Sequence, residues 1–160
     1  MHRIVKAHLI SFVKSFGLEA EDESTQFEKF ATHCVIASRF SSTYDLDDVV
    51  TGPGDEGIDG IAVVIDEGIT TSVEDTQVLF SSSRRNHDVD ILFVQAKRSE
   101  SFDLGDFLKF KEGILRFVTQ TPYLATDDAL KDARRMFDAV LNEVPKIRNG
   151  KPSLTARFVT

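Results

Sequence analysis

The sequence contains a single cysteine, Cys34, and no tryptophan among its 160 residues. One cysteine excludes an internal disulfide and a zinc site built from several cysteines, and it makes a reducing, cytoplasmic setting the expected one. No uninterrupted apolar run approaches the ~18 residues that a membrane-spanning helix needs. The start of the chain carries basic residues throughout and lacks the pattern of a secretory signal. We therefore expect no contact with a membrane.

Basic residues are in the minority, with 19 lysines and arginines against 26 acids and a net charge of −7. This balance argues against a surface that coats nucleic acid in general, although it allows a local basic rim around an acidic site. Hydrophobic residues make up 41% of the chain and include 13 phenylalanines, which is enough to fill the core of one domain. We expect a single domain over residues 1–160, as the N-terminal part of a longer protein.

The spacing of apolar residues predicts four helices and four strands. The helices are expected at His2–Phe16, Ser24–Phe40, Leu104–Thr119 and Thr126–Asn142. The strands are expected at Asp45–Val50, Ile58–Asp66, Asp90–Lys97 and Ser153–Thr160. Val73–Asp88 is weakly helical and is expected to be an exposed insertion, and Cys34 is expected in the core. This order of elements predicts an α/β sandwich around a mixed sheet.

An acidic, glycine-rich turn precedes the most apolar strand, in the stretch GDEGIDGIAVVID from Gly54 to Asp66. Its acids are Asp55, Glu56 and Asp59. One interpretation is a solvated turn in which glycines supply positive φ. A calcium loop starting at Asp55 fits less well, because its third position is Gly57 and its twelfth is Asp66 instead of glutamate.

A third interpretation pairs this turn with the end of the strand Asp90–Lys97. Side chains alternate along a strand, so Gln95 and Lys97 project to one side. If this strand is adjacent and antiparallel to the one that Asp59 opens, a carboxylate, an amide oxygen and an amine converge at one end of the sheet. The simpler alternative is a lysine whose stem covers apolar surface while its amine reaches water.

The order of Asp59, a strand and then Gln95-x-Lys97 resembles the PD-(D/E)XK nuclease superfamily in its Mrr-like branch, where glutamine replaces the usual acid. Most of the chain also resembles the N-terminal domain of the AIPR family, the abortive-infection phage-resistance proteins. The similar segments are Phe27-Glu28, GDEGIDGIAVVI, FVQAKRSESFD and the closing ARFVT. The resemblance implies a restriction-endonuclease-like three-layer sandwich, with a central mixed β-sheet flanked by helices.

The resemblance also implies a catalytic site that hydrolyses DNA phosphodiester bonds with Mg²⁺ or Mn²⁺. Asp59 and Gln95 would be metal ligands, Lys97 the catalytic lysine and Glu28 a further metal ligand from a helix. Oxygen ligands suit Mg²⁺, and a bound cation lowers the pKa of its water. Next to Lys97, Arg98 is a candidate for contact with substrate phosphates.

Two functions stay open at this point. The first is an endonuclease domain of a phage-defence protein, with DNA as the expected partner and RNA as the alternative. The second is a catalytically weak or inactive module of the same fold, used for nucleic-acid binding or protein assembly, because Gln95 lacks the charge of the usual acid. The C-terminal remainder of the protein is an expected partner, and a homodimer is a candidate assembly.

Overall fold

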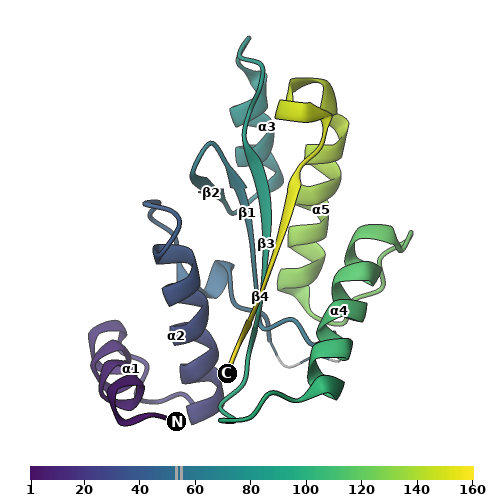
Figure 1. Cartoon of the computed structure of the whole chain (residues 1–160). Coiled ribbons are helices and arrows are strands. Elements are labelled where there is room, and N and C mark those ends of the chain that lie inside the picture. The colour runs from purple at the N-terminus through teal and green to yellow at the C-terminus, as the bar shows by residue number, and fades with distance from the viewer. Residues whose placement is uncertain (53, 55) are drawn as a thin grey trace.

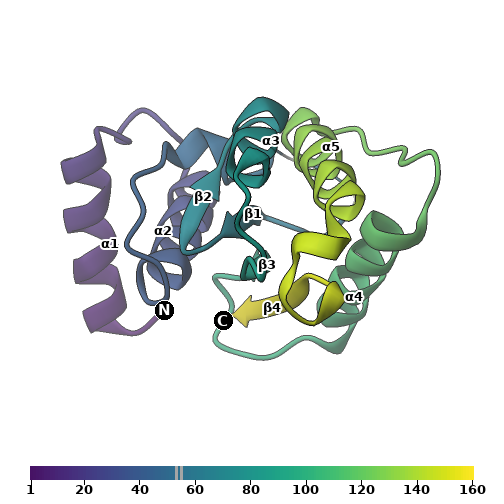
Figure 2. The same cartoon turned by 90° about the horizontal axis from the view of Figure 1, so that it is seen from above.

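The computed structural model describes residues 1–52, 54 and 56–160. A four-stranded sheet has the order β2-β1-β3-β4 and carries helices on both faces (Figures 1 and 2). The strands are β1 (Gly60–Ile65), β2 (Gly68–Thr70), β3 (Val89–Ala96) and β4 (Ser153–Val159). β1 is antiparallel to both β2 and β3, whereas β4 runs parallel to β3. The expected α/β sandwich with a mixed sheet is therefore observed.

In the described part of the chain, five α-helices surround this sheet. They are α1 (Arg3–Phe16), α2 (Glu23–Ala37), α3 (Val73–Ser81), α4 (Leu104–Thr119) and α5 (Asp128–Asn142), with short 3₁₀ turns η1 (Leu46–Asp48), η2 (Val144–Lys146) and η3 (Arg148–Gly150). Figure 2 shows α1 and α2 on one side of the sheet and α4 and α5 on the other. Within the described residues, no helix has the length and apolar character to cross a membrane.

Strand β1 is buried along its whole length, as its uniformly apolar sequence predicts. Its residues alternate between two cores. Ile61 and Val63 face the cluster that contains Phe93, Phe117 and the apolar side of α5. Ala62 and Val64 belong to the smaller cluster under α2. The central strands are thus fixed from both sides, which holds their ends in a defined position.

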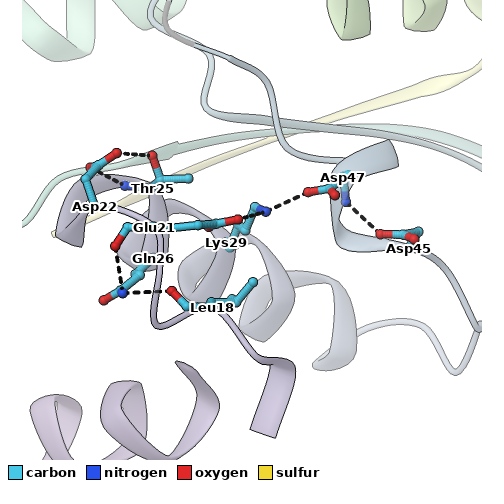
Figure 3. Close-up of polar contacts among 8 residues, drawn as sticks. All are labelled: Leu18, Glu21, Asp22, Thr25, Gln26, Lys29, Asp45 and Asp47. Atoms are coloured by element: carbon cyan, nitrogen blue, oxygen red, sulfur yellow. Dashed lines mark hydrogen bonds and ion pairs between the residues drawn. The ribbon is translucent and has the colours of Figure 1, made fainter. Parts of the chain in front are cut away.

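A buried lysine ties the α1–α2 connection and η1 to α2 (Figure 3). Lys29 is only 6% exposed, and its Nζ lies 2.7 Å from Glu21 Oε1 and 2.6 Å from Asp47 Oδ1. Burial alone lowers the pKa of Lys29, but the hydrogen bonds to Asp47 and Glu21 raise it above its ordinary value. Gln26 adds hydrogen bonds from its amide to the carbonyls of Leu18 and Glu21. α2 is therefore held rigidly over its face of the sheet.

One expected feature of the chain is wrong, and another is only partly right. Asp45–Val50 is not a strand: η1 occupies it, the Asp45 side chain accepts a hydrogen bond from Asp47 N–H, and only an isolated bridge joins Val50 to Gly60. Val73–Asp88 is helical over α3 and mostly exposed, as expected, but it is anchored to the core, because Thr76 and Phe80 are fully buried.

Two smaller differences concern β2 and Cys34. β2 was not expected; it follows a tight turn in which Asp66 and Glu67 both have positive φ, and it pairs with β1 over three residues. Cys34 was expected in the core, but its side chain is exposed on α2.

Candidate metal-binding site at the Asp59 end of the sheet

The antiparallel register places Asp59 opposite Gln95. Gly60 pairs with Val94, and the Asp59 N–H donates to the Val94 carbonyl at 2.9 Å. The Asp59 carboxylate oxygen Oδ2 then accepts hydrogen bonds from Gln95 Nε2 at 2.5 Å and from the Ala96 N–H at 2.7 Å. The two residues that the sequence analysis singled out from different strands are therefore in direct contact.

Gln95 is held tightly by its surroundings. It is only 2% exposed, and its amide nitrogen is engaged by Asp59. A Cβ atom at Gly57 would lie 3.2 Å from Gln95 Oε1 and 3.1 Å from Lys109 Cγ, and Gly57 also has a φ of 67°. Gly57 thus lies close to the Gln95 oxygen. Both its positive φ and the small space around it favour glycine.

Glu28 brings a second carboxylate toward Asp59 from α2. Its Oε1 accepts a hydrogen bond from Ser24 Oγ at 3.0 Å. Burial, and after it the negative charge of Asp59, raises the pKa of Glu28. Burial likewise raises the pKa of Asp59, although the hydrogen bond from Ala96 and the charge of Lys97 oppose it. Asp59 and Glu28 are thus two partly desolvated acids whose negative charges repel each other. A cation between them would stabilise their ionised forms.

Lys97 lies at the rim of this acidic pair. Its positive charge opposes the rise in the pKa of both Asp59 and Glu28, so it acts on both carboxylates. Its Nζ lies 3.5 Å from Asp106 Oδ1 on the first turn of α4. Lys109, also on α4, is a second cation whose charge lowers the pKa of Asp59. α4 therefore supplies both an anchor for Lys97 and a further positive group.

Arg98, the expected substrate contact, points toward a different element. Its guanidinium forms an ion pair with Glu23 Oε2 at 2.5 Å, at the start of α2. The two residues also line a hollow between α1 and α2. Arg98 is thus at the edge of the site, held by α2 and separate from the Asp59–Gln95 contact.

Of the other acids of the turn, Glu56 is described, and it forms no contact with Asp59 there. Asp55 lies outside the described residues. The Glu56 side chain is buried, and its Oε2 has no hydrogen-bond partner there. Burial, followed by the negative charge of Glu56, raises the pKa of Tyr123 to about 12. Glu56 therefore acts on Tyr123, which packs against Phe117 of α4.

The donor set that fits a hard divalent cation is the pair of carboxylates of Asp59 and Glu28, because the Gln95 amide nitrogen faces Asp59 and its oxygen lies under Gly57. Mg²⁺ takes oxygen ligands, keeps several waters and needs only one or two carboxylates. Among the described residues, no group of three or more histidines, cysteines or acids is arranged to hold a metal. The fit therefore depends on the two carboxylates.

Asp106 was not assigned to the site from sequence. It lies three residues before Lys109 and therefore on the same face of α4, the helix that follows the Gln95–Lys97 segment in the chain. That combination of an acid and a lysine on the next helix was the available signal.

Replacing Gly113 by alanine is expected to disturb the site from a distance. A Cβ at Gly113 would lie 2.0 Å from the backbone oxygen of Glu56, so α4 and the turn must separate. We expect Gly113→Ala to lower the free energy of unfolding by about 1–3 kcal/mol and to weaken Mg²⁺ binding, as measured by chemical denaturation and calorimetry. Gly105→Ala on the same helix is the control, since its Cβ meets only the Asp103 side chain at 3.1 Å. Equal stability of the two variants would contradict this packing.

Cation binding at this site should depend on pH. Asp59 and Glu28 have raised pKa values in the folded chain, so the folded state binds their protons more tightly than the unfolded state does. Without a cation, their contribution to stability therefore falls as pH rises from their ordinary pKa values to the raised ones. A cation needs both ionised, so the rise in Tm caused by Mg²⁺ should grow over the same interval and vanish near pH 4, around the ordinary values. Comparing melts with and without Mg²⁺ cancels the opposite contribution of Asp66, whose pKa is lowered. A Mg²⁺ effect that is unchanged at pH 4 would contradict the assignment.

In comparisons with known proteins, no family model, no curated protein and no solved structure matches the chain. The similarity to the AIPR family and to the PD-(D/E)XK superfamily therefore stays a prediction from the residues that carry it.

Proposed function

We propose that this chain is a restriction-endonuclease-like domain that hydrolyses DNA phosphodiester bonds with Mg²⁺ or Mn²⁺, within a phage-defence protein of the abortive-infection type. The observation that carries the proposal is the contact between Asp59 and Gln95 at 2.5 Å. Glu28 lies close enough to Asp59 for the charge of Asp59 to raise the Glu28 pKa, and the charge of Lys97 opposes the rise in the pKa of Asp59. An acid, an amide, a second acid and a lysine thus gather at one end of the sheet, on three different elements.

Each residue has a role that its surroundings support. Asp59 is the anionic anchor, and the Ala96 N–H fixes its orientation. Gln95 donates its amide N–H to Asp59 and so holds the carboxylate in place, while Glu28 adds a charge that partly replaces the acid missing at position 95. A divalent cation supplies a water of lowered pKa and offsets charge on the phosphate. Lys97 would orient the attacking water and donate to the phosphate oxygens as negative charge builds up.

A second candidate is the catalytically weak or inactive module of the same fold. It is favoured by the ion pair between Lys97 and Asp106, since a lysine held by an acid is less available to a phosphate. The neutral Gln95 also favours it, because metal affinity falls when an acid is lost from the ligand set. In that function the same surface binds nucleic acid or another protein without cleaving.

A cleavage assay separates these functions. Supercoiled plasmid, linear duplex, single-stranded DNA and RNA are each incubated with the protein and Mg²⁺ or Mn²⁺, beside Lys97→Met and Lys111→Met. Lys111 is exposed on α4 and serves as the matched control. We expect cleavage by the parent and by Lys111→Met, and a loss of ~100-fold or more for Lys97→Met. Equal cleavage by all three proteins would point to a contaminant, whereas no cleavage with any substrate would favour the inactive module.

A further inference from the structure

Strand β4 forms one edge of the sheet, opposite the edge formed by β2 (Figure 2). Its inner side pairs with β3 over seven positions, from Ser153 to Val159. Within the described part of the chain, no strand pairs with its outer side. Its N-terminal flank is Pro152, and the segment that enters α4 passes its C-terminal end, where Phe102 contacts Phe158.

The backbone geometry shows which groups point outward. The Lys97 N–H donates to the Val159 carbonyl at 2.8 Å, so the polar backbone groups of Val159 face β3. Successive residues of a strand direct their N–H and C=O groups to alternate edges. The backbone groups of Leu154, Ala156 and Phe158 therefore point away from the sheet. An unpaired row of this kind is a template for another strand.

The same three residues carry apolar side chains on one face of β4. Phe158 packs toward the larger core, and its ring lies 5.4 Å from that of Phe102 and 5.9 Å from that of Phe107. Leu154 is 49% exposed and Phe102 is 60% exposed. This edge therefore combines free backbone groups with uncovered apolar surface.

We propose that β4 pairs with β4 of a second copy of this chain, antiparallel, with the two-fold axis at Ala156. In this register Ala156 faces Ala156 of the other copy, and Leu154 faces Phe158 in both directions. All three are outward-pointing positions, so each pair exchanges two backbone hydrogen bonds. The pairing also places an exposed leucine beside an aromatic ring, which is a favourable cross-strand pair. The two sheets then continue as one through the dimer.

The charges and the proline select this register over its neighbours. An axis at Arg157 would place two arginines directly opposite each other, which is destabilising. An axis at Leu154 or Thr155 would bring Pro152 into the pairing, although proline has no N–H to donate. With the axis at Ala156, Arg157 faces Thr155. That threonine lines a hollow of about 350 Å³, which has room for the arginine side chain and whose border carries both signs of charge, Asp88 and Asp90 with Arg39, Arg148 and Lys151.

The first test is the oligomeric state of the chain by sedimentation velocity over a range of concentrations. We expect the parent and Ala156→Ser to be dimers and Ala156→Pro to be a monomer. The proline removes only an outward N–H, so the hydrogen bonds to β3 remain, and circular dichroism should show an unchanged fold. A parent that is monomeric at every concentration would overturn the proposal, as would a dimer that survives Ala156→Pro.

Cross-linking tests the register itself and does not depend on the proline. In a Cys34→Ser background, Ala156→Cys should form an intermolecular disulfide under mild oxidation, because hydrogen-bonded antiparallel partners lie about 5.5 Å apart between Cα atoms. Leu154→Cys is the matched control, since it would face Phe158 and not itself. Faster cross-linking at position 154 than at 156 would refute the register. Neither experiment depends on nuclease activity.

Discussion

Replacing Asp59 by asparagine is expected to weaken Mg²⁺ binding about 10- to 100-fold and to reduce DNA cleavage by ~100-fold or more. The reason is that Asp59 supplies the anion of the site, while its Oδ2 also accepts hydrogen bonds from Gln95 and Ala96. Asparagine keeps the shape and can still accept one N–H, so the loss should come from the missing charge. Calorimetry with Mg²⁺ measures binding, and gel-based cleavage of plasmid DNA measures activity.

Glu74→Gln is the control for this experiment, because it also removes one negative charge. Glu74 is exposed at the start of α3, and Figure 1 shows α3 beside the opposite end of β1 and β3. Its variant should bind Mg²⁺ and cleave DNA like the parent. Undiminished Mg²⁺ binding by Asp59→Asn would exclude the carboxylate as a ligand, whatever the outcome of the cleavage assay.

Replacing Phe117 by alanine is expected to lower the free energy of unfolding by about 3–5 kcal/mol. The side chain is fully buried. Its ring centroid lies 5.2 Å from that of Phe93 in β3 and 5.5 Å from that of Phe137 in α5. The substitution would leave a cavity and remove the contacts of α4 with both the sheet and α5. Urea denaturation followed by circular dichroism measures the loss.

Phe102→Ala provides the comparison for Phe117→Ala, because it removes the same atoms from a ring that is largely exposed. We expect its cost to stay below about 1 kcal/mol. Similar losses for the two variants would mean that the core is not centred on Phe117. Since α4 carries Asp106 and Lys109, Phe117→Ala should also weaken Mg²⁺ binding.

The helices could be predicted from the sequence to within a few residues, because their apolar faces repeat with the helical period. α1 and α4 lie where that period placed them, and Gly17 ends α1 in the left-handed conformation. The starts of α2 and α5 were less accurate. In both helices an aspartate caps the first turn, Asp22 and Asp127, in place of the expected Ser24 and Thr126.

The errors came from residues whose structure depends on distant neighbours. The pattern of Asp45–Val50 is also compatible with a strand. The Asp45 cap favours a 3₁₀ turn instead, and Val50 alone forms a bridge to β1. α3 looks polar in sequence, yet two of its residues, Thr76 and Phe80, are fully buried. Local composition does not reveal such a contact.

The candidate site was predictable in its centre and not at its borders. Asp59 and Gln95 could be paired because strand alternation and an antiparallel arrangement require it. The partners of Lys97 and Arg98 depend on where α4 and α2 pack, so Asp106 and Glu23 could not be assigned from spacing alone. Long flexible side chains at strand ends take the partner that tertiary packing provides.

The two glycines that touch the acidic turn set a limit on how this protein can change. Gly113 leaves no room for a side chain beside the Glu56 backbone, and Gly57 combines a φ of 67° with close contacts to Lys109 and Gln95. The seam between the turn and α4 therefore disfavours any larger residue at both points. Variants with altered reactivity should arise at Glu28, Lys97 or Lys109, which project from this seam, and seldom at the two positions that close it.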